Sequence, residues 1–154
     1  MKANLTKTSR RDFFGTLAAA GAAIVTWSTS AGATPETVAA EAKKLFGDKT
    51  PQSGKVKLDL PTIAENGLVV PLGFEVESPM TDKDYVKTVA IFAEGNPNPQ
   101  IATFHFTPLS PKAAAAIRIR LAQTQNIVVF AEMSNGDIYV AKKEVKVTIG
   151  GCGG

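Results

Sequence analysis

The chain has few of the side chains on which disulfides and metal sites depend. Its 154 residues contain one cysteine, one histidine and one tryptophan. A single cysteine excludes an internal disulfide, and a single histidine excludes a metal site with two histidine ligands. Trp27 stands near the N-terminus, so the Cys-Trp-Cys pattern of antibody domains is absent. The apolar stretch at residues 17–25 is shorter than the roughly 20 residues that a spanning helix needs.

The N-terminal segment has the features of an export signal. Arg10 and Arg11 stand in the run SRRDFF, which resembles the twin-arginine consensus and leads into the apolar stretch. Ala31-Gly32-Ala33 then forms a small-residue cleavage site. We predict that residues 1–33 are a cleaved twin-arginine leader, that the protein is exported to a bacterial periplasm, and that the mature chain begins near Thr34.

The basic character of the chain comes from this leader. Four of the 17 basic residues and one of the 14 acidic residues belong to it, so the remainder is formally neutral. A neutral chain gives no support to binding of nucleic acid or of an anionic membrane surface. Residues 34–149 are long enough for one domain with its own core.

This domain is predicted to open with one short helix. Thr34 followed by Pro35 is typical of a helix start, and Gly47 ends the pattern. The apolar residues at helical spacing between them are Val38, Ala42, Leu45 and Phe46.

After the helix the hydrophobic pattern indicates β-strands. Apolar runs recur at residues 55–60, 68–76, 85–93, 101–106, 115–121, 127–133 and 138–147. Turn residues separate them, and Asn135-Gly136 predicts a hairpin. Short strands without long connecting helices predict an all-β fold, an immunoglobulin-like antiparallel β-sandwich of about seven strands. The aromatic residues expected in its core, besides aliphatics, are Phe74, Phe92, Phe104, Phe106 and Phe130.

Other polar residues carry little sign of chemistry. His105 has no second histidine to share a metal with, and we interpret it as a residue on a strand face with a local hydrogen bond. Arg118 and Arg120 share one strand face; paired guanidinium groups can hold an oxoanion, but a solvated or partner-facing stripe is the favoured interpretation. Asp82 and Asp84 read as loop carboxylates. We expect no metal, no cofactor and no catalytic residue.

The C-terminal residues are the informative ones. Gly150, Gly151, Cys152, Gly153 and Gly154 place the only thiol on a narrow arm after the last predicted strand. Glycines permit backbone conformations closed to other residues, so we expect a flexible arm that adapts to several sites. An unperturbed thiol has a pKa of about 8.5, and no basic residue adjoins Cys152 in sequence. The exposed thiol therefore favours a substrate that other proteins act on over a self-sufficient catalyst.

Five segments together resemble the SoxY family. They are the twin-arginine leader, AEGNPNP at residues 93–99, TFHFTP at 103–108, RIRLA at 118–122 and the terminal GGCGG. The resemblance implies the sulfur-carrying subunit of the bacterial thiosulfate-oxidising system, with oxidised sulfur intermediates held covalently on Cys152. It also implies a heterodimer with SoxZ and successive visits to the heme-containing SoxXA, the SoxB hydrolase and the SoxCD sulfane dehydrogenase.

Three other interpretations of the tail stay open. It could be an engineered conjugation handle or a cloning scar. It could belong to a thiol-redox enzyme, although such an enzyme needs an activating base or a resolving cysteine. It could also form an intermolecular disulfide with a like subunit.

Overall fold

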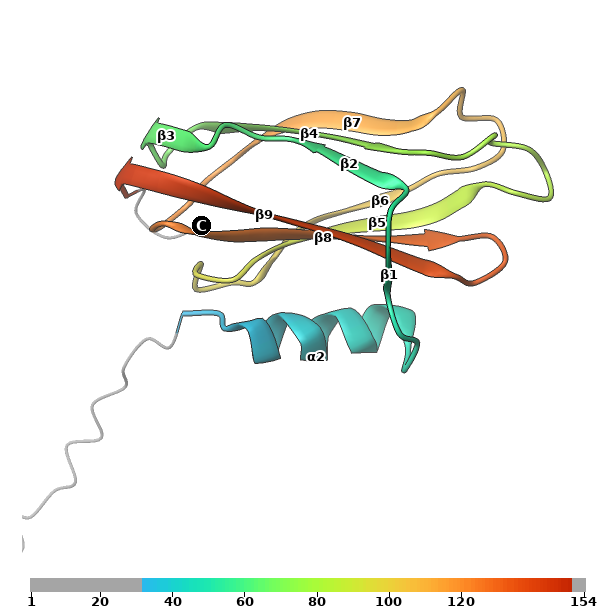
Figure 1. The fold of residues 1–154 in the computed structure, drawn as a ribbon, viewed down its shortest axis with the longest axis horizontal. Helices are drawn as coiled ribbons and strands as arrows, with labels where there is room; N and C mark the ends of the chain where they lie inside the picture. The colour runs from blue at the N-terminus through green and yellow to red at the C-terminus, as the bar shows by residue number, and fades with distance from the viewer. Residues whose placement is uncertain (1–31, 151–154) are drawn as a thin grey trace, which may run out of the picture.

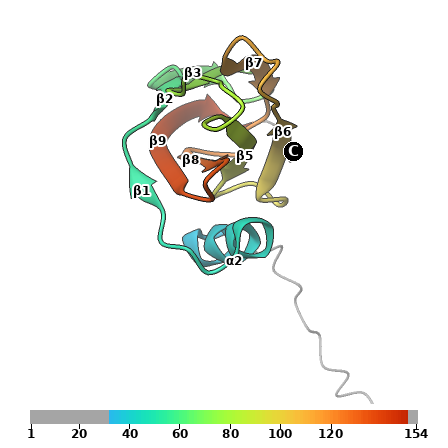
Figure 2. The same cartoon turned by 90° about the vertical axis from the view of Figure 1, so that its right-hand side faces the viewer.

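The computed structural model describes residues 32–150. Two sheets and one helix form three layers, with a six-stranded sheet between the helix and a three-stranded sheet (Figures 1 and 2). Most of the expected leader lies outside the described residues, and so do Gly151, Cys152, Gly153 and Gly154. Among residues 32–150, no helix has both the length and the apolar character needed to cross a membrane.

The six-stranded sheet carries the end of the chain. Its strands are β1 (Gln52–Ser53), β3 (Ile63–Asn66), β5 (Val86–Ala93), β6 (Gln100–His105), β8 (Gln125–Met133) and β9 (Ile138–Ile149). The order is β1-β9-β8-β5-β6, with β3 also paired to β9. β8 pairs antiparallel with β5 and β9, whereas β1 and β3 both pair with β9 in parallel.

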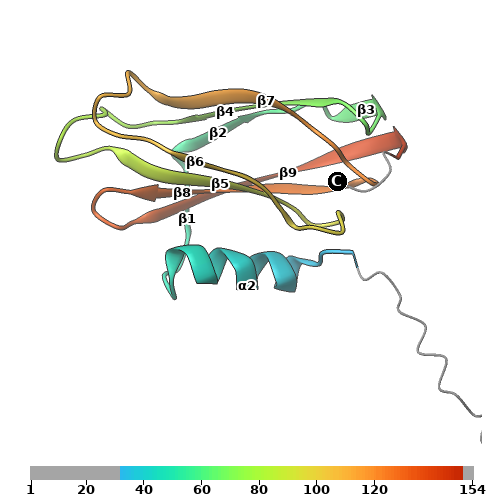
Figure 3. The ribbon, with the colours of Figure 1, turned by 180° about the vertical axis from the view of Figure 1, so that it is seen from behind.

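The three-stranded sheet closes the sandwich. It has the order β2-β4-β7 and consists of β2 (Val56–Asp59), β4 (Val70–Val76) and β7 (Ala113–Ile119). All its pairs are antiparallel, and Val70 pairs with Ile119 at one end while Val76 pairs with Ala113 at the other. Figure 3, which views the molecule from behind, shows this sheet stacked over the larger one. The main apolar core fills the space between the two sheets.

The central strands β5 and β8 are covered on both faces, which explains the five consecutive apolar residues in each, at 89–93 and 127–131. Val89 and Ile91 face the core between the sheets, whereas Ala90 and Phe92 face the helix. In β8, Phe130 likewise packs under the helix, with its ring 6.1 Å from that of Phe46. Strands buried on both sides lose the alternation that marks half-exposed strands.

The helix α2 (Pro35–Phe46) begins and ends where the sequence predicts. Thr34 caps it: the Thr37 N–H donates to the Thr34 hydroxyl (3.3 Å), and the Thr34 N–H donates to the Thr37 hydroxyl (2.7 Å). A hydrogen bond between the Thr34 side chain and the Glu36 carboxyl also lowers the pKa of that carboxyl. Val38, Ala42 and Phe46, four residues apart, face the sheet. Leu45 does not join them and is 45% exposed, because only one stripe of the helix contacts the sheet.

The predicted sandwich is confirmed, and each of the seven predicted strands is present. Residues 134–137 form the predicted hairpin turn, in which Gly136 has a φ of 83°. Among the predicted core aromatics, Phe104 and Phe106 are only partly buried and lie at the margin, although both rings contact Phe74. The sequence did not predict β1 and β3, which are two and four residues long.

Candidate functional site

The candidate site is the place where β9 releases the C-terminal arm. Gly150 is the last described residue. Cys152 and the other three predicted arm residues, Gly151, Gly153 and Gly154, lie outside the described residues. The described part of the site is therefore the base of the arm, and its geometry fixes where the arm begins.

Backbone and side-chain hydrogen bonds hold β9 as far as Ile149. The Gly67 N–H donates to the Ile149 carbonyl oxygen (2.8 Å), and the Val147 N–H donates to the Thr124 hydroxyl (2.9 Å). The Leu121 N–H in turn donates to the Gly67 carbonyl oxygen (2.8 Å). The end of β9 is thus bonded on both sides, to the β3–β4 turn and to the β7–β8 loop.

Gly150 is a glycine for a packing reason. A Cβ built on this residue would collide with the Ala122 carbonyl oxygen. Because that oxygen belongs to backbone, it cannot swing away as the end of a side chain could. The first residue of the arm therefore lies flat against the β7–β8 loop.

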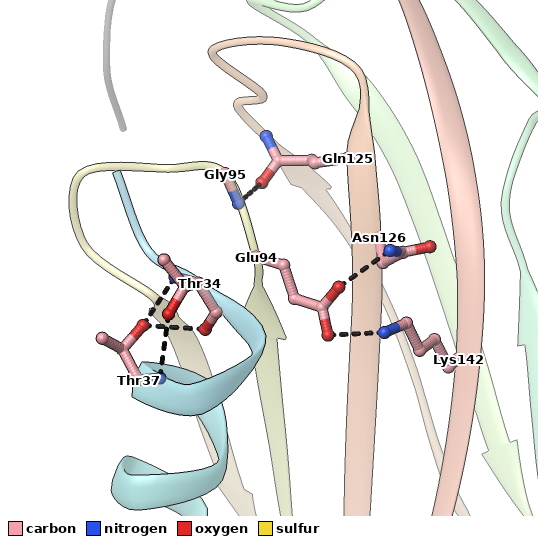
Figure 4. Close-up of polar contacts among 7 residues, drawn as sticks. All are labelled: Thr34, Thr37, Glu94, Gly95, Gln125, Asn126 and Lys142. Carbon is pink, nitrogen blue, oxygen red and sulfur yellow. Dashed lines mark hydrogen bonds and ion pairs between the residues drawn. The ribbon is translucent and has the colours of Figure 1, made fainter. Parts of the chain in front are cut away.

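Two buried amides fix this loop from below. Asn96 and Gln125 are 2% and 6% exposed. The Asn96 side-chain oxygen accepts hydrogen bonds from the Ala122 N–H (3.0 Å) and from the Gln125 side chain (2.8 Å), and the Asn96 Nδ2 donates to the Arg120 carbonyl oxygen (2.8 Å). The Gly95 N–H donates to Gln125 Oε1 (2.6 Å), as Figure 4 shows. We call Asn96 and Gln125 the amide clamp.

The start of α2 lies on the β5–β6 loop, which carries Asn96. The Ala33 N–H donates to the Asn96 carbonyl oxygen (2.8 Å), and Ala33 is buried. The first residues of the folded body and the last ones therefore lie at the same end of the sandwich. Figure 4 shows Thr34 close to the Gly95 turn.

An ion pair with a mostly buried carboxylate lies beside the amide clamp. Glu94 Oε1 lies 2.6 Å from Lys142 Nζ, and Glu94 Oε2 accepts from the Asn126 amide (2.8 Å), as Figure 4 shows. The Glu94 side chain is only 8% exposed. Glu94 follows β5, Asn126 is in β8 and Lys142 is in β9. These charge-assisted hydrogen bonds therefore join the three strands.

The structure brings together two of the sequence segments singled out above. Residues 93–99 contain Glu94 and Asn96, and residues 118–122 end on the Ala122 carbonyl under Gly150. The clamp itself was not predicted. Asn96 stands in the segment GNPNP without any mark of burial, and no pattern in the sequence links Gln125 to it.

The remaining candidates lie elsewhere or are exposed. His105 is exposed on β6, with Nδ1 3.3 Å from the Thr88 hydroxyl, which confirms a local hydrogen bond on a strand face. Arg118 and Arg120 are exposed, and neither makes a salt bridge within residues 32–150. Asp82 and Asp84 are in a loop, and Asp84 bonds locally to Thr81.

No metal centre forms in the described part of the chain. Among residues 32–150, no three carboxylate, imidazole or thiol side chains gather as a set of ligands. A pocket of about 380 Å³, lined by Phe46, Phe130 and Ile138 among others, lies under the C-terminal end of α2. Its lining residues include Phe46 and Gly47 at the C-terminal end of α2, and that end of the helix lies away from the end of β9 (Figure 1).

Known proteins share both the sequence pattern and the fold. The family model described as sulfur oxidation protein SoxY matches residues 42–152, so the match extends to Cys152. The structure of the sulfur carrier protein SoxY from Chlorobium limicola f thiosulfatophilum is 31% identical, with a TM-score of 0.64 over 74% of this chain and 98% of that one. No curated protein matches the chain in sequence.

More distant structures share the fold alone. A superoxide reductase (neelaredoxin) from Ignicoccus hospitalis is 18% identical, with a TM-score of 0.54 over 75% of this chain and 94% of that one. A putative superoxide reductase from Thermotoga maritima is 10% identical, with a TM-score of 0.54 over 63% and 93%. The family match spans most of the domain and the greater part of the whole chain. The chain belongs to the SoxY family of sulfur oxidation proteins.

Proposed function

We propose that the chain is a covalent sulfur carrier whose Cys152 holds intermediates derived from thiosulfate. Family membership and the likeness to a sulfur carrier support a carrier role in sulfur oxidation. The observation that carries the proposal is the position of the only thiol. Cys152 stands three positions after Ile149, the last residue held by the hydrogen bonds described above, and the family match includes it.

The chemistry needs no cofactor on the carrier. Joining the Cys152 thiolate to thiosulfate gives Cys–S–S–SO₃⁻ and releases two electrons, which a heme-containing partner such as SoxXA accepts. Water then converts this adduct into the persulfide Cys–S–S⁻, sulfate and two protons, the step assigned to SoxB. The sulfane sulfur that remains is the substrate of SoxCD. The carrier's own part is exchange at sulfur, which one thiol can undergo repeatedly.

The unactivated thiol fits this role. Each partner can supply the metal, heme or cationic groups that generate or oxidise the thiolate in its own active site. The carrier is then a protein-bound substrate of those enzymes and not an enzyme itself. We propose SoxZ as its permanent heterodimer partner through the sandwich, and the three enzymes as transient ones.

The proposed compartment is the periplasm. The small-residue site ends at Ala33, directly before the Thr34 cap of α2. In the full chain the Ala33 N–H bonds to Asn96, so this contact has to open before a peptidase can bind the segment in an extended form. Export through the twin-arginine route delivers folded protein, which agrees with a body that forms around its own core.

Replacement of the thiol tests the function directly. Cys152→Ser removes the nucleophile without touching the described body, so we expect complete loss of thiosulfate-dependent turnover in a reconstituted system. The melting temperature and the complex with SoxZ should be unchanged, which size-exclusion chromatography and calorimetry measure. Thiosulfate turnover by the Cys152→Ser protein would exclude the proposal.

A further inference from the structure

Exposed apolar side chains lie beside the base of the arm. Leu68, Val69 and Ile149 are 43%, 57% and 67% exposed. They are neighbours, because the Gly67 N–H bonds to the Ile149 carbonyl oxygen and Leu68 and Val69 follow Gly67 directly. We call these three residues the collar.

The collar is the place where the apolar core reaches the surface. Along β9, Val145 is fully buried, Val147 is half-buried and Ile149, on the same side of the strand, is exposed. Beside it, Val70 is fully buried and Leu68 is exposed. Large apolar side chains left in water favour contact with another apolar surface.

The length of the arm determines what that surface belongs to. Each extended residue spans about 3.3–3.6 Å, so the Cα of Cys152 lies at most about 7 Å from that of Gly150. Even a weak, transient interface covers roughly 600 Å² on each partner, a disc about 14 Å in radius. Any enzyme that takes Cys152 into its active site must therefore contact the surface around Gly150, and the collar is part of that surface.

We propose that the collar is the docking surface for the enzymes that react with Cys152, and that it meets an apolar rim around the mouth of their active-site channels. This inference rests on the proposed carrier function. Burial of three apolar side chains gives a non-directional attraction that several different partners can share. The same attraction is too small to hold any one of them permanently, which suits a carrier that has to leave.

A cation stands at the edge of the collar. Val70 pairs with Ile119 in antiparallel strands. Val69 precedes Val70 and Arg120 follows Ile119, so these two exposed residues lie at the same end of the β4–β7 pair. Arg120 makes no salt bridge within residues 32–150. An apolar centre with a charged margin is the usual composition of a transient interface, so the partner rim should carry a carboxylate opposite Arg120.

The test uses the carrier in its complex with SoxZ and a purified client enzyme. The double variant Leu68→Ser/Val69→Ser removes two collar side chains, and Leu109→Ser is the matched control. Leu109 is 94% exposed and precedes Ala113, at the end of β7 opposite to the arm. We expect the collar variant to raise the KM for the carrier at least tenfold with little change in kcat, and Leu109→Ser to leave both unchanged.

Two further measurements make the result specific. Reaction of Cys152 with a small aromatic disulfide reports the thiol without any client, and it should proceed at the wild-type rate in all variants. An unchanged KM in the collar variant would overturn the docking proposal. Loss of the SoxZ complex would overturn it too, by assigning the collar to the permanent partner. Either result would leave the carrier function intact, since that function fails only if Cys152→Ser remains active.

Discussion

At the scale of single residues, the base of the arm depends on two buried amides and one glycine. Asn96 bonds to the backbone of Arg120 and Ala122, and the Ala122 carbonyl leaves no room for a side chain on Gly150. The loop under the arm is thereby fixed. β9 and Gly150 are therefore held against this loop.

The reactive residue proposed for this site can be picked out from the sequence, whereas the hydrogen bonds that hold the site cannot. Cys152 is conspicuous because it is the only thiol and is flanked by glycines. Asn96 resembles any loop asparagine, because its role comes from burial against Gln125, 29 positions away. Contacts between distant segments leave no local pattern, so the amide clamp could not be predicted.

Removal of the clamp should cost stability. Asn96→Ala leaves the part-buried Ala122 N–H and Arg120 carbonyl oxygen without their partner, and it removes one of the two oxygens to which the Gln125 side chain donates. Unsatisfied buried groups cost about 1–3 kcal/mol, so we expect a loss of about 2 kcal/mol in the free energy of unfolding, measured in urea. Asn98→Ala, at an exposed position of the same loop, is the control and should change it by less than about 0.5 kcal/mol. Equal effects of the two substitutions would contradict a clamp.

At the scale of elements, the strands with strong hydrophobic patterns were predictable and the short ones were not. β5 and β8 each contain five consecutive apolar residues because the helix covers one face of the sheet and the second sheet covers the other. β1 and β3 are short and mostly polar, and they exist because the long strand β9 offers them an edge in parallel. Pairing of that kind depends on tertiary position and not on propensity.

The helix shows the same limit within one element. Its start, its end and three of its four apolar contacts follow from the sequence. Leu45 fits the helical spacing equally well, yet it lies outside the stripe that the sheet covers. Periodicity gives the apolar side of a helix, and packing decides how wide the buried stripe is.

Docking of α2 therefore depends on Phe46 and not on Leu45. Phe46 is 9% exposed and packs against Phe130. Loss of a buried phenylalanine costs about 3–5 kcal/mol in a core, and at the end of a helix we expect about 2–3 kcal/mol for Phe46→Ala. Leu45→Ala should cost less than about 1 kcal/mol. Thermal unfolding of the two variants measures the difference, and a larger loss from Leu45→Ala would show that α2 is not seated as described.

At the scale of the whole molecule, the folded body and the proposed reactive group are separated along the chain. The apolar cores lie between the two sheets and under α2. At one end of the sandwich, hydrogen bonds hold β9 as far as Ile149. The proposed reactive group follows three positions later. Under the two proposals made above, this separation lets the thiol enter differently shaped active sites while the body keeps one surface for recognition. It also explains why the body needs no catalytic residues of its own under the proposed function.

The most direct measurement is the intact mass of the native protein, purified without reductant from cells supplied with thiosulfate. We expect a chain that begins near Thr34 and carries sulfur-containing adducts, all removed by reduction and all mapped to Cys152. A bare thiol under turnover conditions, or only a protein–protein disulfide, would contradict it.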